Sequence, residues 1–117
     1  MKKKPTNPLL HGTLDALILE TLSRGGRHGY GVARWIEETT GGVLQIGEGS
    51  LYPALYRLER RGWIKADWGL SERGRKAKFY HLTERGREQL GHETDEWEKF
   101  SGAISRVLRS ARRRSAS

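Results

Sequence analysis

The chain has 117 residues, enough for one small domain but not for two. It contains no cysteine, which excludes disulfides, thiolate metal sites and a thiol nucleophile, and which fits a reducing cytoplasm. No apolar run approaches the roughly 20 residues of a membrane span, and the basic residues 1–5 lack the apolar stretch of a signal peptide. These features predict one cytoplasmic domain without a membrane partner.

The net charge of +8 is unevenly distributed. Three lysines occupy residues 2–4 and five arginines lie in residues 106–114, which leaves 14 basic and 14 acidic groups in residues 9–105. Within that neutral body, residues 57–78 hold eight basic and three acidic groups, whereas residues 84–99 hold three basic and six acidic groups. A basic middle followed by an acidic segment predicts one face suited to a polyanion.

The N-terminal half predicts a flexible arm, two helices and a short strand. Residues 1–8 are basic and contain two prolines, so we expect a flexible arm there. Apolar residues at helical spacing predict a first helix over about residues 12–24 and a second over about residues 30–39. Residues 43–46 are too few for a helix and are expected to add one strand.

A third helix is predicted over residues 49–61, ended by Gly62. At about 100° per residue, its leucines Leu51, Leu55 and Leu58 fall in one narrow sector. The opposite side carries Pro53, Tyr56, Arg57 and Arg60. Tyrosines and arginines there are typical of a helix that enters a phosphate-lined groove, although this helix alone fits a solvated basic face equally well.

The C-terminal half predicts a hairpin, a long helix and a tail. Residues 63–68 and 78–82 alternate between apolar and polar side chains, which predicts two strands. The segment between them, residues 69–77, contains glycines and basic residues and predicts a hairpin with a basic tip. Residues 83–109 predict a last, long helix, and residues 110–117 a disordered basic tail.

The expected fold class is therefore mainly α with a small β-hairpin. Three helices followed by a two-stranded ribbon predict a winged helix-turn-helix domain over residues 9–82. In such a domain the third helix enters the major groove of DNA, and the hairpin, called the wing, touches the flanking backbone. The helix over residues 83–109 is expected to be a C-terminal dimerisation helix.

Several short segments resemble the PadR family of bacterial transcriptional regulators. They are residues 12–19 (GTLDALIL), 28–31 (HGYG), 49–59 (GSLYPALYRLE), 61–64 (RGWI) and 79–83 (FYHLT). The resemblance covers about residues 9–90, and the length fits the short subgroup with a single C-terminal helix. It implies a repressor that binds a palindromic double-stranded DNA operator as a homodimer and is released by a small molecule in at least some members. No cofactor is expected.

The resemblance also implies operator contacts from the second helix, the third helix and the wing. These residues are Tyr30, Ser50, Tyr52, Pro53, Tyr56, Arg57, Arg75, Lys76 and Lys78. The outward face of the third helix adds Arg60. A guanidinium of Arg57 or Arg60 can reach a guanine edge or clasp a phosphate, and the sequence leaves the choice open. Packing against the first helix is the structural alternative for Tyr52.

Basic residues outside the third helix are expected to add affinity more than specificity. Each phosphate that the wing neutralises releases counterions, so binding should weaken as salt rises. A merely solvated loop is the simpler alternative. The lysines of residues 2–4 either reach DNA as an arm does or form a solubilising tail.

The last helix carries a heptad pattern. Its apolar residues at a and d positions are Leu90, Trp97, Phe100, Ile104 and Val107, with Glu93 interrupting one d position. Such a seam predicts a dimer interface, whereas a helix folded back on its own domain is the alternative.

Trp97 has two interpretations. In short PadR members that bind drugs or flat aromatic molecules, the ligand lies between tryptophans at the dimer interface, so the resemblance implies a small aromatic ligand near Trp97, with Trp35 lining the same space. The alternative is that Trp97 only fills the seam, since large aromatics dominate interface burial.

Rival functions find less support in the residues. The four histidines are scattered without metal-ligand spacing, and no nucleophile–base pair can be identified, so an enzyme is not expected. A winged-helix protein-interaction module without operator binding is the main alternative, because fold alone does not fix function. RNA binding lacks the expected aromatic stacking platform.

Overall fold

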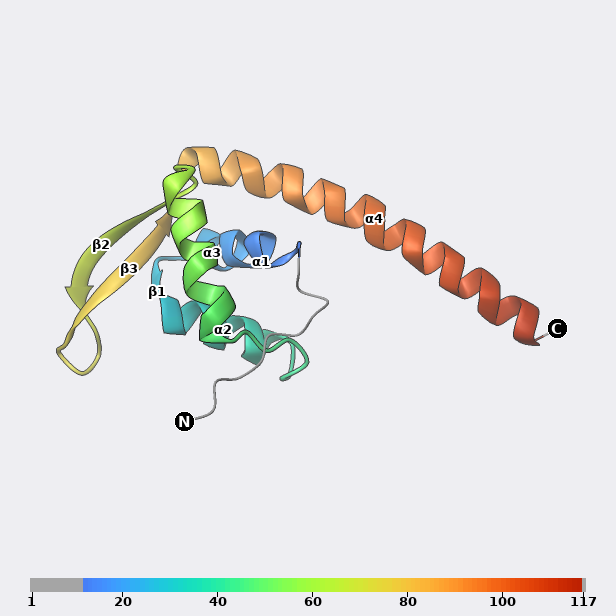
Figure 1. Ribbon diagram of the computed structural model, residues 1–117, viewed down its shortest axis with the longest axis horizontal. Coiled ribbons are helices and arrows are strands. Elements are labelled where there is room, and N and C mark those ends of the chain that lie inside the picture. Colours follow the sequence, from blue (N-terminus) through green and yellow to red (C-terminus); the bar gives the residue numbers. More distant parts are fainter. Residues whose placement is uncertain (1–11, 117) are drawn as a thin grey trace.

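The computed structural model of the chain describes residues 12–116, with side chains described for residues 12–110. The expected arm over residues 1–8 lies outside the described residues. The elements, in chain order, are α1 (Leu14–Ser23), β1 (Arg27–His28), α2 (Gly29–Thr39), α3 (Glu48–Arg60), β2 (Ile64–Leu70), β3 (Lys76–Leu82) and α4 (Glu84–Ala116) (Figure 1). This arrangement confirms the predicted fold class: three helices, a wing and a long C-terminal helix.

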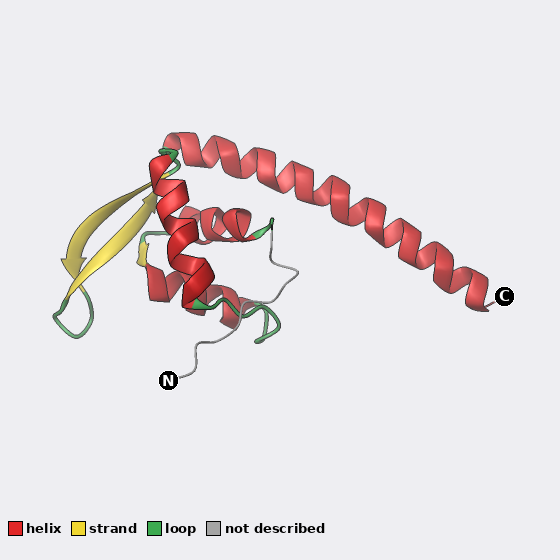
Figure 2. Cartoon of the chain, in the orientation of Figure 1, coloured by secondary structure: helices red, strands yellow, loops and turns green. Residues whose placement is uncertain are grey.

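The core lies where α1, α2 and α3 meet the base of the sheet (Figure 2). Its buried side chains are Leu14, Ile18, Leu19, Leu22, Val32, Ala33, Ile36, Ile46, Leu51, Ala54, Leu55, Leu58, Ile64 and Tyr80. The three leucines predicted to share one sector of α3 are all buried, and Ala54 lies between them. Because only this stripe of α3 is apolar, burying it fixes which side of the helix faces solvent.

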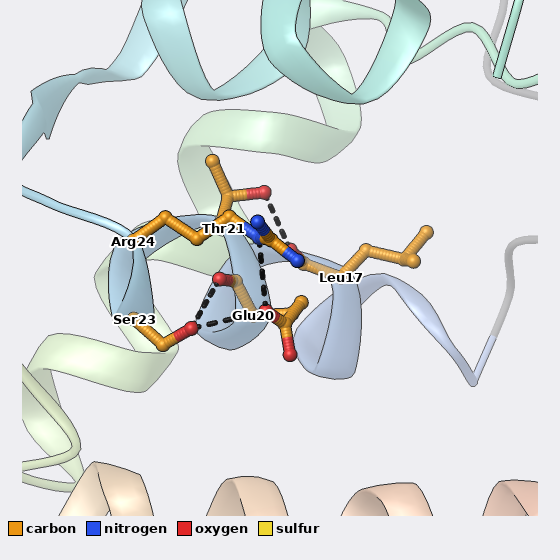
Figure 3. A network of polar contacts seen from close by, with 5 residues as sticks. All are labelled: Leu17, Glu20, Thr21, Ser23 and Arg24. Atoms are coloured by element: carbon orange, nitrogen blue, oxygen red, sulfur yellow. Dashed lines mark hydrogen bonds and ion pairs between the residues drawn. The ribbon is translucent and has the colours of Figure 1, made fainter. Parts of the chain in front are cut away.

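The C-terminal end of α1 is held by short-range polar contacts (Figure 3). Thr21 is fully buried, and its hydroxyl donates to the Leu17 carbonyl at 2.7 Å, so that the polar group is satisfied inside the helix. Ser23 donates to the Glu20 carbonyl at 2.6 Å, and Arg24 Nε donates to the Glu20 carboxylate at 3.2 Å. These bonds close the last turn of α1 before the chain turns into β1.

Helix α3 ends in a Schellman motif. The Trp63 N–H donates to the Leu58 carbonyl at 3.1 Å, and the Gly62 N–H donates to the Glu59 carbonyl at 3.0 Å. Gly62 has φ 75°, a conformation that glycine adopts without a Cβ penalty. The predicted stop at Gly62 is therefore confirmed, with its physical reason.

The sheet contains the two predicted strands of the wing and, in place of the strand expected at residues 43–46, the two-residue strand β1. All pairs are antiparallel in the order β1-β3-β2, with Arg27 opposite Tyr80 and Ile64 opposite Leu82. The two-residue strand β1 is too short to show any periodicity in the sequence. Strands β2 and β3 run further toward the tip than expected, so the loop shortens to residues 71–75.

The expected strand at residues 43–46 was wrong. This segment is a loop. Two of its backbone N–H groups donate to side chains at the C-terminal end of α2 and not to a neighbouring strand. The Leu44 N–H donates to Thr40 Oγ1 at 3.1 Å, and the Ile46 N–H donates to the Glu37 carboxylate at 3.2 Å. Ile46 is buried in the core, which explains why the segment is apolar.

Thr83 joins the end of α3 to the start of α4. Its hydroxyl donates to the Gly62 carbonyl at 2.7 Å and accepts the Gly86 N–H at 3.0 Å, so that it caps the long helix. From this joint α4 passes over α1 and continues away from the domain (Figure 1). The helix runs to Ala116, so the prediction of a disordered tail over residues 110–117 was wrong as far as residue 116. After Gly102 the sequence contains neither glycine nor proline to end a helix.

Gly86 is the tightest point of this joint. A Cβ at this position would overlap the Trp63 carbonyl oxygen and press on Leu82. We therefore expect Gly86→Ala to lower the free energy of unfolding by about 1–3 kcal/mol in urea titrations. Gly91→Ala is the matched control, because a Cβ there meets nothing within 4 Å, and it should raise stability by up to about 1 kcal/mol. Equal effects of the two variants would contradict the packing.

Candidate nucleic-acid interface

The solvent side of α3 divides into one central row and two flanks. The central row, at spacings of four, three and four residues, contains Gly49, Pro53, Tyr56 and Arg60. One flank carries Tyr52 and Glu59, seven residues apart, and the other carries Ser50 and Arg57, also seven apart. Their contacts show that the flanks turn toward different neighbours.

Tyr56 and Arg60 form one unit on the central row. Tyr56 is 60% exposed, and the Arg60 guanidinium lies over its ring at 5.7 Å from the centroid. Arg60 Nη1 also lies 3.4 Å from the Tyr56 hydroxyl. The ring therefore limits the orientations of the guanidinium while leaving it in solvent. Pro53, one turn earlier on this row, is exposed as well.

Arg57 is turned sideways toward α1. Its Nη2 lies 3.0 Å from Asp15 Oδ1, and about half of the Arg57 side chain is exposed. Arg57 was predicted to lie with Arg60 on the outward side, but the structure separates them: Arg60 faces away from the core, whereas Arg57 pairs with the first helix. Ser50, on the same flank, is partly buried.

The opposite flank faces the wing. Lys78 Nζ on β3 lies 3.3 Å from Glu59 Oε1 on α3 and 5.6 Å from the centroid of the Tyr80 ring. Lys78 thereby links the wing to α3 while remaining partly exposed. Arg75 and Lys76 lie at the tip and at the start of β3, and both are exposed.

A cleft of about 260 Å³ opens between the start of α2, the start of α3 and the wing. The side chains that line it include three residues predicted as DNA contacts: Tyr30, Tyr52 and Lys78. Tyr80, His28, Gly29, Ser71 and Ala77 line the rest of it. His28 also caps α2 by accepting the Gly31 N–H on Nδ1 at 3.0 Å. Hydroxyls and an ammonium around one cleft are donors suited to phosphate oxygens.

Two of these phenols have a raised pKa. Burial raises the pKa of Tyr52 above its ordinary value, and the nearby Glu48 and Tyr80 add to the effect. Burial also raises the pKa of Tyr80, which the charge of Lys78 partly offsets. Near neutral pH both hydroxyls are therefore available as hydrogen-bond donors.

The predicted dimer residues on α4 divide into two groups. Leu90 is partly buried against the core of its own domain, so its apolar surface already has a use within one chain. Trp97, Phe100, Ile104 and Val107 are exposed, although they are large and apolar. The start of α4 therefore packs on its own domain, which was the alternative to a dimer interface. The rest of α4 carries an apolar seam that this chain leaves exposed.

The two tryptophans predicted to line a ligand site have different surroundings. Trp97 is 49% exposed on the α4 seam. Trp35 packs against the core, and the guanidiniums of Arg24 and Arg27 lie over its ring at 5.2 and 5.5 Å from the centroid. The cleft beside the wing includes neither of them.

Several residues of this surface were missed by the sequence reasoning. Asp15 pairs with Arg57, and Glu59 pairs with Lys78. Because Asp15 lies 42 residues from Arg57, no local sequence pattern predicts that pair. Trp68 and Leu70 are largely exposed on β2, next to the basic residues of the wing. Their spacing of an even number of residues from Ile64, which places them on the same face of β2, was the available signal.

Within the described part of the chain, no three or more histidine, aspartate or glutamate side chains are arranged to hold a metal ion. The same residues include no helix that is long and apolar enough to cross a membrane.

Comparison with known proteins gives a consistent result. The model of the transcriptional regulator PadR-like family matches residues 18–92. An uncharacterized protein of Lysinibacillus sphaericus is 34% identical over 96 residues, which cover 82% of this chain and 88% of that protein. Transcriptional regulator YqjI of Escherichia coli is 34% identical over 94 residues, but the chain spans only 44% of its length.

Solved structures agree. A transcriptional regulator from Clostridium thermocellum matches with a TM-score of 0.77 and 29% identity, covering 86% of this chain and 97% of that one. A PadR-like transcriptional regulator from Bacillus cereus matches with a TM-score of 0.74 and 29% identity, covering 87% and 97%.

The Asp15–Arg57 pair is expected to be weak. Exposed ion pairs contribute about 0.2–1 kcal/mol, because water screens the charges and the side chains lose entropy. A double-mutant cycle of Asp15→Ala and Arg57→Ala, measured by urea unfolding, should therefore give a coupling energy below about 1 kcal/mol. A coupling of several kcal/mol would instead make Arg57 a structural anchor that cannot be released to a ligand.

Proposed function

Because the chain belongs to the PadR-like family of transcriptional regulators, we propose that it is a homodimeric repressor that binds a palindromic DNA operator through α3 and the wing. The family consists of transcriptional regulators, not enzymes, so the proposal starts from regulation by DNA binding. The proposal adds the operator symmetry, the dimer, the direction of regulation, a place in the cytoplasm and the contact residues.

The observation that carries the proposal is that α3 has one buried apolar side and one exposed polar side. A stripe of buried leucines anchors the helix, and the opposite row presents Tyr56 and Arg60 to solvent. The wing stands beside it with Lys76 and Arg75 exposed, and the cleft between them gathers Tyr30, Tyr52 and Lys78. Winged helix-turn-helix domains bind DNA in this way: a helix enters a groove, and the ribbon reaches the flanking phosphates.

The dimer is supported by the uncovered seam on α4. Four large apolar side chains at heptad positions stay exposed in one chain: Trp97, Phe100, Ile104 and Val107. A second copy would bury them as a coiled coil does. Two copies would also supply two recognition helices for half-sites about one DNA turn apart.

We also propose that a small aromatic effector binds at Trp97. This ring is half exposed on the seam, where two copies would bring two such rings together. Trp35 supports an effector site less well, because arginines already cover its ring.

Selection from random-sequence duplex DNA tests the function itself. The purified protein should enrich an inverted repeat whose half-sites are centred about 10 base pairs apart, and binding should weaken steeply with salt. A protein that enriches no sequence would instead be a winged-helix protein-interaction module, the alternative function for this fold.

Arg60 is the residue on α3 for which we expect the largest effect on operator binding. Arg60→Ala should weaken binding to the selected duplex by about 1–3 kcal/mol and reduce discrimination against altered half-sites. Fluorescence anisotropy with selected and altered duplexes measures both quantities. Lys99→Ala is the matched control, because it removes one exposed positive charge from α4 and should change neither. If Arg60→Ala binds as the wild type does, Arg60 is not a contact.

Ile104 tests the dimer. Ile104→Asp places a charge in the apolar seam and should shift the monomer–dimer equilibrium toward monomer in sedimentation velocity runs at several concentrations. Gly102→Asp makes the same charge change on the side of α4 away from the seam, where an added Cβ meets nothing within 4 Å, and should leave the dimer intact. A wild-type protein that stays monomeric throughout, or an unaffected Ile104→Asp dimer, would contradict this interface.

A further inference from the structure

The wing carries a pair of large apolar side chains that are exposed to solvent. Trp68 is 68% exposed and Leu70 is 70% exposed, and they lie two residues apart at the end of β2. Alternate residues of a strand share a face, so both are on the side of β2 that begins with Ile64, which is buried in the core. The core-facing side of the strand thus continues past the domain into solvent.

Two lysines of β3 lie opposite this apolar pair. In the antiparallel ladder Trp68 lies opposite Lys78, and Leu70 lies opposite Lys76. Residues that are directly opposite share one face, so two apolar and two basic side chains form one patch. We call these four residues the wing patch.

The wing patch faces the α3 side of the molecule. Lys78 reaches across to Glu59 on α3 at 3.3 Å, which fixes the direction of this face of the sheet. The Glu59 flank of α3, which adjoins the row of Tyr56 and Arg60, therefore faces the side of the wing that carries Trp68 and Leu70. A ligand long enough to contact both would run from α3 onto the wing.

The chemistry of the patch fits the edge of a DNA duplex. Protein interfaces tend to exclude lysine from their apolar centres, whereas a nucleic-acid backbone alternates phosphates with apolar sugar edges. The two apolar residues are about 7 Å apart along the strand, comparable to two base-pair steps. Apolar side chains that enter a minor groove are a known way to hold and bend DNA.

We propose that Trp68 and Leu70 contact the sugars of the minor groove that flanks the segment read by α3, with Lys76 and Lys78 on the adjacent phosphates. This inference rests on the proposed DNA-binding function. It gives the wing an apolar contribution to operator binding that is distinct from charge neutralisation.

The test separates the two contributions by their salt dependence. On the selected duplex, Trp68→Ala should lower affinity by roughly tenfold with an unchanged slope of log affinity against log salt, because no charge is removed. Lys76→Ala should reduce that slope by about one. Trp68→Phe should restore most of the affinity, since it keeps an aromatic ring. Val43→Ala, which trims an exposed apolar side chain outside the wing, is the control and should bind as the wild type does.

Hydroxyl-radical footprinting locates the contact, because this reagent reports the exposure of deoxyribose. The wild type should protect the flanking minor groove, and Trp68→Ala should lose that protection while keeping the central one. Unchanged affinity and footprint in both Trp68→Ala and Leu70→Ala, with selective wild-type binding, would overturn the wing patch and leave the proposed function standing. A change in oligomeric state on Trp68→Ala with unchanged affinity would also overturn it, in favour of a second copy of the chain as occupant. A wild type that binds no duplex selectively would overturn both proposals.

Discussion

The one-sided burial of α3 is the constraint on which the rest of the surface depends. Leu51, Leu55 and Leu58, with Ala54 between them, are the only part of this helix that the core can accept. Once they are buried, the helix cannot rotate without exposing apolar surface, at about 25 cal/mol per Å². That constraint places Tyr56 and Arg60 outward, Glu59 toward the wing and Arg57 toward α1. The orientation of every polar contact on the helix follows from it.

The charges of this surface are arranged as loosely held pairs around a more accessible centre. Asp15 pairs with Arg57, and Glu59 pairs with Lys78, each with substantial exposure. Exposed pairs of this kind are weak, so a phosphate can compete for either cation at little cost in stability. The same carboxylates reduce the net positive charge of the free surface, which should lower the affinity for unrelated polyanions.

Much of the fold could be predicted from the sequence because its signals are local. The helix period of the three leucines, the glycine stop after α3 and the alternation of the wing strands each depend on neighbouring residues. Strand β1 could not be predicted, because two residues show no period and their partner is more than 50 positions away. The strand expected at residues 43–46 failed because Thr40 and Glu37 take up its backbone donors.

For the proposed contact surface, the sequence indicated the residue types but not the directions in which the side chains point. Tyr30, Tyr52 and Lys78 came from family resemblance, and the structure gathers them around one cleft. The separation of Arg57 from Arg60 depends on Asp15, which is distant in sequence. The tight packing of Gly86 depends on the Trp63 carbonyl, and nothing in the sequence around Gly86 distinguishes it from other helical glycines. Long-range packing decided these points, and a single sequence does not encode it in any local pattern.

The most direct test of the central claim compares two duplexes of equal length and base composition: one with the inverted repeat enriched by the wild-type protein, the other with its bases shuffled. Binding to both is measured by anisotropy over a series of salt concentrations. A recognition helix that reads bases predicts that the first duplex binds about 10³-fold or more tightly, with both affinities falling as salt rises. Equal affinities for the two duplexes at every salt concentration would contradict sequence recognition by α3.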